Sequence, residues 1–281
     1  RGASIIVQIK EKNLLSFTFF EMIFQLKKIL YRILPESSYL RWLHRGFYFL
    51  FWIGALKKDE RFKFHYMVKK LIESNYTVLD IGANLGYFSR NFSDLTKNGK
   101  VISIEPVRPF FETLQYFLGS RKNLTLFNYA LGQEEGTITM VMPTSNGIIR
   151  TGLPHIAESE EEKMQHRTHD VEIKRPSELL KDLTRIDYIK CDIEGYERTV
   201  FEEMKGLIEK HQPIIQIEID PKNRGFMFEY FSDLGYIQYG IAKFRIVKEI
   251  PGEQQEQGDY IFVPKSQDQV FEKRMRSKGV L

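Results

Sequence analysis

One strand–loop–helix segment constrains the fold more than any other part of the chain. Residues 77–81 form a short β-branched run, and Gly82, Asn84 and Gly86 follow within five positions. Residues 87–95 then show apolar side chains at helical spacing. Two glycines and an asparagine permit a sharp turn and a close approach of a ligand to the backbone. The pattern therefore predicts a ligand-binding loop at the edge of an α/β sheet. The first turn of the next helix has free N–H groups that face this loop.

Further strands and helices alternate along the rest of the chain. This alternation predicts βαβ units and a mostly parallel sheet with right-handed crossovers. The expected strands lie at 100–104, 124–129, 186–193, 213–219, 236–239 and 260–263, and the expected helices at 108–118, 198–210 and 223–234. Residues 137–142 interrupt the alternation with a strand pattern, and 171–174 are expected to be its hairpin partner across a long polar loop.

The first quarter of the chain differs from the remainder in charge and aromatic content. Residues 1–76 contain 14 Lys or Arg against 6 Asp or Glu, together with both tryptophans. Three amphipathic helices are expected there, at 14–34, 39–56 and 61–75. We predict a helical N-terminal extension over 1–76 that acts as a lid, a homodimer interface or a peripheral membrane contact through residues 1–60.

Composition limits the remaining possibilities. The chain has 281 residues, of which 42% are hydrophobic and 28% charged, as in a soluble globular protein. We expect the α/β domain to span 77–264 and a basic tail to span 265–281. The net charge of +4 is too small to indicate a nucleic-acid partner, and none is predicted. A single cysteine, Cys191, is compatible with the cytoplasm, and the longest apolar run has ten residues, too few to span a bilayer.

The chemistry of the loop separates two classes of nucleoside ligand. Glu105 follows Gly86 by 19 residues at the end of the second strand, where a carboxylate can accept hydrogen bonds from a ribose diol. A dinucleotide loop would place a glycine where Asn84 stands. Asp80 precedes Gly82 by two positions, and a carboxylate at the loop mouth would repel a pyrophosphate but suit the cationic S-adenosylmethionine.

Acidic side chains follow two later strands. Asp192 and Glu194 are two positions apart, so they share one face of a strand end. There they could hold a cation, orient a substrate hydroxyl or accept its proton. Glu218 ends the next strand and is expected to point into the same crevice. His155 is a further candidate base, and Arg150 a candidate contact for an anionic or hydroxylated substrate. No histidine spacing indicates zinc, and no metal site is predicted.

These motifs together resemble the FkbM family of S-adenosylmethionine-dependent methyltransferases. The resemblance covers about Thr77 to Ile219 and is carried by Asp-Ile-Gly-Ala-Asn-Leu-Gly at 80–86, Ile-Glu-Pro at 104–106, Asn-Tyr-Ala at 128–130 and Lys-Cys-Asp-Ile-Glu-Gly at 190–195. It implies a Rossmann-like class I fold with a seven-stranded, mostly parallel sheet and one antiparallel strand. It also implies that Asp80, Gly82, Asn84 and Gly86 line the methionine end, that Glu105 holds the ribose, and that Asn128 and Ala130 border the adenine. Ala83, Tyr87, Pro106 and Asp192 complete the predicted cofactor site.

The resulting hypothesis is an S-adenosylmethionine-dependent O-methyltransferase. Its acceptor would be a small molecule or a glycan. The methyl group would go to a hydroxyl of a saccharide or of a glycosylated or polyketide natural product. Asp192, Glu218 or His155 would accept the proton, and Glu194 and Arg150 would contact the acceptor. Two alternatives stay open: a nicotinamide-dependent dehydrogenase or epimerase, and a non-catalytic membrane-associated interaction protein.

Overall fold

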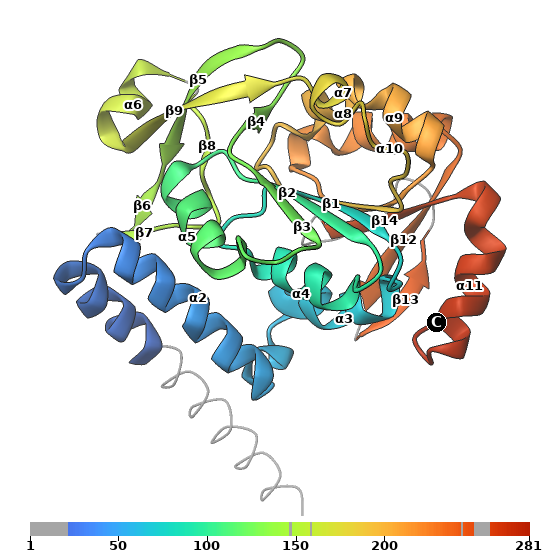
Figure 1. The fold of residues 1–281 in the computed structure, drawn as a ribbon, viewed down its shortest axis with the longest axis horizontal. Coiled ribbons are helices and arrows are strands. Elements are labelled where there is room, and N and C mark those ends of the chain that lie inside the picture. Colours follow the sequence, from blue (N-terminus) through green and yellow to red (C-terminus); the bar gives the residue numbers. More distant parts are fainter. Residues whose placement is uncertain (1–21, 146–147, 158, 243, 250–258) are drawn as a thin grey trace, which may run out of the picture.

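Eight strands form the central sheet in the part of the chain that the computed structural model describes, residues 22–145, 148–157, 159–242, 244–249 and 259–281 (Figure 1). The strand order is β13-β12-β14-β11-β10-β1-β2-β3. The strands are β1 (Thr77–Ile81), β2 (Lys100–Ile104), β3 (Leu124–Phe127), β10 (Tyr188–Cys191), β11 (Ile214–Glu218), β12 (Tyr236–Ala242), β13 (Arg245–Lys248) and β14 (Asp259–Pro264).

The directions of these strands confirm the expected class I arrangement. Strands β3, β2, β1, β10 and β11 are parallel, and β14 runs antiparallel between β11 and β12. Strand β13 pairs antiparallel with β12 and adds an edge strand to the predicted seven. Because the chain leaves β1 for β2 and returns to β10 on the other side, the sheet has a topological switch between β1 and β10. Ligands of open α/β sheets bind at such a switch, beyond the carboxyl ends of the strands.

Helices cover both faces of the sheet. The helical segments are α2 (Glu36–Trp52), α3 (Lys63–Leu71), α4 (Tyr87–Leu95), α5 (Arg108–Leu118), α6 (Glu160–Gln165), α7 (Pro176–Leu179), α8 (Glu197–Glu203), α9 (Lys205–His211), α10 (Arg224–Asp233) and α11 (Asp268–Ser277), with short 3-10 turns η1 (Ala55–Lys58), η2 (Glu60–Phe62), η3 (Pro221–Asn223) and η4 (Lys265–Gln267). Helices α8, α9 and α10 bury one face of the strands, and α3, α4 and α11 bury the other. Alternate side chains of each strand serve the two layers, as the period of two requires.

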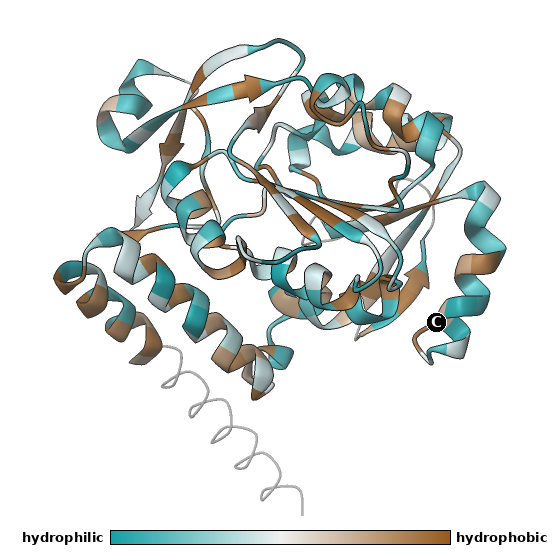
Figure 2. Ribbon diagram, viewed as in Figure 1, coloured by the Kyte–Doolittle hydropathy of each residue, from teal (hydrophilic) through white to brown (hydrophobic). Residues whose placement is uncertain are grey.

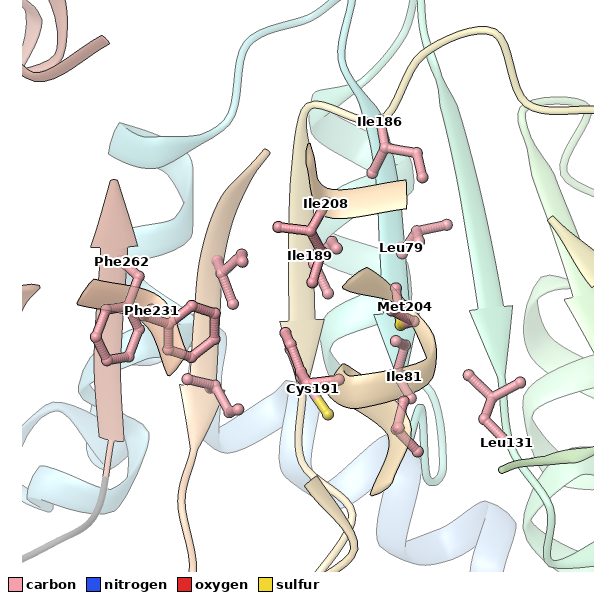
Figure 3. Packing of buried hydrophobic residues seen from close by; sticks show 14 of the residues in the cluster. Leu79, Ile81, Leu131, Ile186, Ile189, Cys191, Met204, Ile208, Phe231 and Phe262 are labelled. Carbon is pink, nitrogen blue, oxygen red and sulfur yellow. The ribbon is translucent and has the colours of Figure 1, made fainter. Parts of the chain in front are cut away.

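One layer of this core is drawn in Figure 3. Phe231 of α10 stacks on Phe262 of β14 with ring centroids 4.1 Å apart. Met204 and Ile208 lie over Leu79 and Ile189 in the same cluster. Cys191 is also buried in this cluster, and it is a free thiol. The predicted helix over 198–210 is divided into α8 and α9 at Met204, which lies between the two segments.

The expectation of a basic tail at 265–281 is wrong. These residues form η4 and α11, and Phe271 and Met275 of α11 are buried in the core layer with β12 and β14. Figure 2 shows why the sequence was misleading, because most of α11 is hydrophilic and only a narrow part of it is apolar. Two apolar residues four positions apart are enough to dock a helix when they share one face.

A smaller sheet stands beyond the carboxyl edge of the main one. Its order is β4-β9-β5-β8, with β4 (Ala130–Leu131), β5 (Gly136–Met142), β8 (His155–Ile156) and β9 (Arg167–Lys174). The antiparallel pairing of β5 with β9 confirms the predicted hairpin partners. A two-stranded ribbon, β6 (Thr144–Ser145) and β7 (Ile148–Ile149), extends from it toward α2 (Figure 1).

The N-terminal extension packs directly on the domain that carries the loop after β1. In α2, Nδ1 of His44 forms a hydrogen bond with the carbonyl oxygen of Leu85 at 2.8 Å. The ring of His44 stacks on Phe117, and the Tyr48 hydroxyl donates to the carbonyl oxygen of Tyr87 at 2.7 Å. The predicted helix over 14–34 lies partly outside the described residues. Of the part that is described, residues 22–33 are helical. Within the described ranges, no helix has the length and apolar character needed to cross a membrane.

Candidate active site

The loop after β1 is held between the ends of two neighbouring strands. The backbone N–H groups of Gly82 and Ala83 both donate to the carbonyl oxygen of Ile104 at the end of β2. Gly82 has a φ of 74°, and a Cβ there would lie 1.9 Å from the carbonyl oxygen of Asp192. Only glycine can therefore occupy position 82, because both the backbone angle and the space exclude a side chain.

Asn84 replaces the central glycine of a dinucleotide loop for a visible local reason. Its φ is 52°, in the left-handed region that asparagine tolerates better than most residues. Its side-chain oxygen accepts from the N–H of Leu85 at 2.7 Å, and its side-chain nitrogen donates to the carbonyl oxygen of Thr151. Asn84 thus joins the β1 loop to the segment that follows β7.

Glu105 lies under this loop with both carboxylate oxygens engaged. One accepts from the N–H of Asn84 at 2.7 Å and the other from the N–H of Val107 at 2.8 Å. Burial raises the pKa of Glu105 to about 7, although the two N–H donors oppose the rise. The Asn128 side chain donates to the carbonyl oxygens of Glu105 and Pro106, and so fixes the strand end from below.

A pocket opens above Glu105, with an empty volume of about 740 Å³ including open solvent. Its walls are largely apolar and include Phe110, Tyr129, Ile138, Met140 and Ile156. We refer to it as the cofactor pocket. Seven of the predicted site residues line it: Gly82, Asn84, Glu105, Pro106, Ala130, Asp192 and Glu194. A sheet-edge pocket of this kind, with largely apolar walls and a few acidic groups of which Glu105 is the buried one, suits a nucleoside.

Other predicted cofactor residues do not line the cofactor pocket. Asn128 acts through the backbone of Glu105 and Pro106. Gly86 has a φ of 86°, and a Cβ there would lie 2.7 Å from Leu114, so this glycine allows α5 to pack closely. Ala83 and Tyr87 line a second, adjacent pocket instead.

The placement of Asp80 at the loop mouth is wrong. Its side chain is fully buried beneath the loop and lines neither pocket. One carboxylate oxygen accepts from the Ser89 hydroxyl at 2.6 Å, and the other lies 3.9 Å from Nζ of Lys190. Burial raises the pKa of Asp80, against the attraction of Lys190. Asp80 therefore supports the site from behind.

Lys190 is a central residue to which the sequence analysis assigned no role. It is 4% exposed in the middle of β10, and its Nζ donates to the carbonyl oxygen of Gly82 at 3.0 Å and to Asp192 at 3.3 Å. Burial opposes its charge, but Asp192 and Asp80 together raise its pKa above the usual value. The available signal was a lysine within the otherwise apolar run Tyr188–Cys191, which is unexpected in a strand buried on both faces.

The second pocket contains four carboxyl groups at its inner end. Asp192 and Glu194 line both pockets, and Glu218 is the cross-strand neighbour of Asp259 in the β11–β14 pair. Burial, then the charge of Asp192, raises the pKa of Glu194 to about 7 and that of Glu218 to about 8. Burial also raises the pKa of Asp259 to about 7, against the attraction of Lys63. The pocket thus concentrates groups that exchange protons near neutral pH.

This second pocket is the larger, with an empty volume of about 1880 Å³ including open solvent. We call it the acceptor pocket, since it meets the cofactor pocket along Gly82, Asn84 and Asp192. Its walls come from the N-terminal extension, the β7 segment and the sheet edge, and they include Tyr39, Phe62, Phe64, Tyr87 and Phe88.

A family model for the methyltransferase FkbM domain matches residues 80–237, which is more than half of the chain. The chain belongs to the FkbM methyltransferase family. It is 25% identical over 172 residues to methyltransferase sdnD from Sordaria araneosa, covering 52% of this chain and 65% of that protein. It is 24% identical over 160 residues to methyltransferase 1 from Beauveria bassiana, covering 49% of this chain and 61% of that protein. The chain thus spans less than two thirds of the length of these curated relatives.

Among solved structures, the chain is similar to the methyltransferase FkbM from Methylobacillus flagellatus KT. The TM-score is 0.46 at 16% sequence identity, and the alignment covers 68% of this chain and 44% of that chain. Membership of the FkbM family favours the methyltransferase hypothesis over the dehydrogenase or epimerase alternative.

In this FkbM-family chain, the structure does not support His155 as the base. Pro154 and Ile156 line the cofactor pocket, whereas His155 between them lines neither pocket. Its Nε2 lies 2.7 Å from a Glu162 oxygen, and its Nδ1 lies 2.9 Å from the carbonyl oxygen of Leu153. Alternation along β8 turns the ring away from the cavity, although its charge still lowers the pKa of Glu194.

The histidine that does line the acceptor pocket is His65 of α3. It is stacked on Phe88 with ring centroids 3.9 Å apart, and burial followed by the charge of Lys190 lowers its pKa to about 3. His65 is therefore a neutral wall residue. No pattern in the sequence indicates this role, because His65 reaches the pocket only through the packing of α3 beside α4.

In the described ranges, no group of three or more His, Cys, Asp or Glu side chains is arranged to hold a metal ion.

Proposed function

We propose that this protein is an S-adenosylmethionine-dependent O-methyltransferase acting on a hydroxyl of a saccharide or of a glycosylated or polyketide natural product. The observation that carries the proposal is the junction of the two pockets at Gly82 and Asp192. A pocket with largely apolar walls and one buried carboxylate there adjoins a larger pocket rich in carboxyl groups.

The residues of the cofactor pocket fit S-adenosylmethionine. Each oxygen of Glu105 accepts one backbone hydrogen bond and keeps capacity for another, as a ribose diol would require. The apolar wall at Phe110 and Met140 suits an adenine, and Asp192 and Glu194 offer negative charge to an ammonium group. When bound, S-adenosylmethionine would supply an electrophilic methyl group on a sulfonium.

Asp192 is our candidate for accepting the proton of the acceptor hydroxyl. It lies at the boundary of the two pockets, where the acceptor and the cofactor would meet, and Lys190 fixes one of its oxygens. Glu218 is a second acidic group of the acceptor pocket, and it could form a hydrogen bond with an acceptor oxygen. These two carboxyl groups would position the hydroxyl, which is the main catalytic need of such a transfer.

Cofactor titration tests the proposal directly. Isothermal calorimetry should show saturable binding of S-adenosylhomocysteine and no binding of NAD. Transfer of a radiolabelled methyl group from S-adenosylmethionine to a panel of saccharides and glycosylated natural products would then identify the acceptor. Binding of NAD without binding of S-adenosylhomocysteine would reject the proposal.

The N-terminal extension has an apolar surface that could contact a partner. Several large apolar side chains of the N-terminal extension are exposed, among them Ile33, Phe49, Trp52 and Ile53. They support a contact of this extension with a second copy of the chain or with the cytoplasmic surface of a membrane. Flotation with anionic liposomes and sedimentation of the free protein distinguish these two contacts.

A further inference from the structure

Three cationic side chains from distant parts of the sequence meet in the acceptor pocket. Lys27 comes from the N-terminal helix over 22–33, Arg61 from η2, and Arg150 from the segment after β7. Packing brings these segments together, because Phe24 of the same helix packs against the cluster that contains Tyr39, Ile148 and Ile149. The convergence is thus a product of the fold.

The acceptor pocket therefore has an acidic part and a basic part. The carboxyl groups of Asp192, Glu194, Glu218 and Asp259 adjoin the sheet edge and the cofactor pocket. Lys27, Arg61 and Arg150 come from the N-terminal extension and from the segment after β7. Lys190, a further cation of the lining, is paired with Asp192 at the acidic end. A molecule that spans the pocket would have hydroxyl groups at the acidic end and negative charge at the basic end.

Lys27 is the least satisfied of these three cations. It is half-buried, and no described residue forms an ion pair or hydrogen bond with it. Burial, followed by the charges of Arg61 and Arg150, lowers its pKa. Holding a cation where burial and like charges both disfavour it costs free energy that a bound anion would recover.

Arg61 retains free donors although it pairs with an acid. Its Nε and Nη2 donate to the Asp59 carboxylate, the latter at 2.5 Å. A guanidinium has five N–H donors, so its Nη1 remains available for another acceptor. The backbone of Arg150 is fixed by a hydrogen bond from its N–H to the carbonyl oxygen of Pro143.

We infer that Lys27, Arg61 and Arg150 form an anion subsite that binds a phosphate group carried by the hydroxylated acceptor. Phosphate offers several acceptor oxygens in different directions, which matches donors that approach from three separate segments. The phosphate could belong to a sugar phosphate or to a lipid headgroup. The assignment of the subsite to an acceptor rests on the proposed methyltransferase function, whereas anion binding itself does not.

Inorganic phosphate at constant ionic strength is the first probe. The lysines are dimethylated with ¹³C-formaldehyde, which preserves their charge, and the NMR signal of Lys27 is followed. We expect a saturable shift of this signal, and a loss of phosphate affinity of at least about tenfold in Lys27→Met and in Arg61→Leu, measured by calorimetry. Lys28→Met is the matched control, because Lys28 is also half-buried on the same helix but does not line the pocket. It should bind phosphate like the wild type.

A second pair of measurements separates this inference from the proposed function. Lys27→Met should bind S-adenosylhomocysteine within about twofold of the wild type, since Lys27 does not line the cofactor pocket. Glucose 1-phosphate and dihexanoyl phosphatidic acid are then each competed against inorganic phosphate. Tighter binding of either one supports the subsite and identifies the source of the phosphate.

Three results would overturn the inference. They are an absence of saturable phosphate binding at Lys27, equal weakening in Lys27→Met and Lys28→Met, and acetate binding as tight as that of phosphate. Failure of both organic phosphates to compete would overturn the assignment of the subsite to an acceptor. Failure of the wild type to bind S-adenosylhomocysteine would instead reject the proposed function, and the result of the phosphate-binding test would still stand.

Discussion

The two pockets that meet at Gly82 are built from different kinds of segment. The cofactor pocket is made mostly by the ends of the adjacent strands β1, β2 and β10 and by short loops directly after them. The acceptor pocket combines the N-terminal extension, η2, the β7 segment and the far strands β11 and β14. One pocket therefore depends mostly on a few sequence motifs, whereas the other depends on the packing of segments up to 235 residues apart, from Phe24 to Asp259.

This difference explains what each pocket can tolerate. The cofactor pocket rests on strand ends whose backbone is fixed by the sheet, so its loop has little freedom to adapt. The acceptor pocket rests on helices and loops that can vary while the sheet stays the same. We therefore expect substitutions in the cofactor half to affect both stability and cofactor binding, and those in the acceptor half to affect mainly the acceptor.

The largest expected effect is that of Gly82→Ala. The new Cβ would lie 1.9 Å from the Asp192 carbonyl oxygen, at a φ of 74°. Because backbone atoms cannot move aside cheaply, we expect a loss of about 4 kcal/mol or more in the free energy of unfolding. Urea denaturation measures it. Gly136→Ala is the control, since a Cβ there meets nothing within 4 Å, and wild-type-like stability of Gly82→Ala would contradict the local account of the loop.

The second effect is that of Lys190→Met. Removing a buried cation leaves Asp80 and Asp192 without their shared partner, and breaking a buried pair costs about 3–5 kcal/mol. Adding Asp80→Asn should restore a large part of this loss, because the fully buried carboxylate is then absent and only the more exposed Asp192 is left without its partner. Lys205→Met, in an exposed pair with Glu209, should change stability by less than about 0.5 kcal/mol. Equal effects of the two lysine substitutions would remove Lys190 from the centre of the site.

The sequence predicted the cofactor half well and the acceptor half poorly. The bounds of β1, α4, β2 and α5 agree with the prediction because each segment has its own hydrophobic period and turn residues. Gly82, Asn84 and Glu105 were found for the same reason. His65 and Lys27 were not found, since their roles arise only when α3 and the N-terminal helix pack beside the sheet. Asp80 was identified but misplaced, because alternation along β1 turns it beneath the loop.

The third prediction concerns the pH dependence of cofactor affinity. Burial raises the pKa of Glu105 to about 7, so the folded apoprotein keeps a proton there between the ordinary value of 4.5 and about 7. Stability that this proton confers is lost as the pH rises through 7, while the ionised carboxylate needed by a ribose diol becomes available. We expect the affinity for S-adenosylhomocysteine to rise up to about tenfold per pH unit below 7 and to level off above it.

Calorimetry between pH 5.5 and 8.5 checks this dependence. In Glu105→Gln, affinity should be lower by about 1–3 kcal/mol at pH 8 and nearly independent of pH. A pH profile of the wild type that is flat, or identical to that of Glu105→Gln, would show that Glu105 does not contact the ligand.

The smallest expected effect tests whether the N-terminal extension is coupled to the cofactor loop. His44→Phe keeps the stack on Phe117 but removes the hydrogen bond to the carbonyl oxygen of Leu85. Loss of one neutral hydrogen bond should cost about 1 kcal/mol of stability.

Burial also lowers the pKa of His44 to about 4. The folded state therefore loses stability as the pH falls from 6.5 toward 4, and this loss should be absent in the variant. His211→Phe, at the end of α9 and outside both pockets, is the control for cofactor affinity. We expect His44→Phe to bind S-adenosylhomocysteine within about threefold of the wild type, because Glu105 and the strand ends hold the loop independently. A loss of tenfold or more would show that the extension positions the loop, and the two halves of the site would then be one cooperative unit.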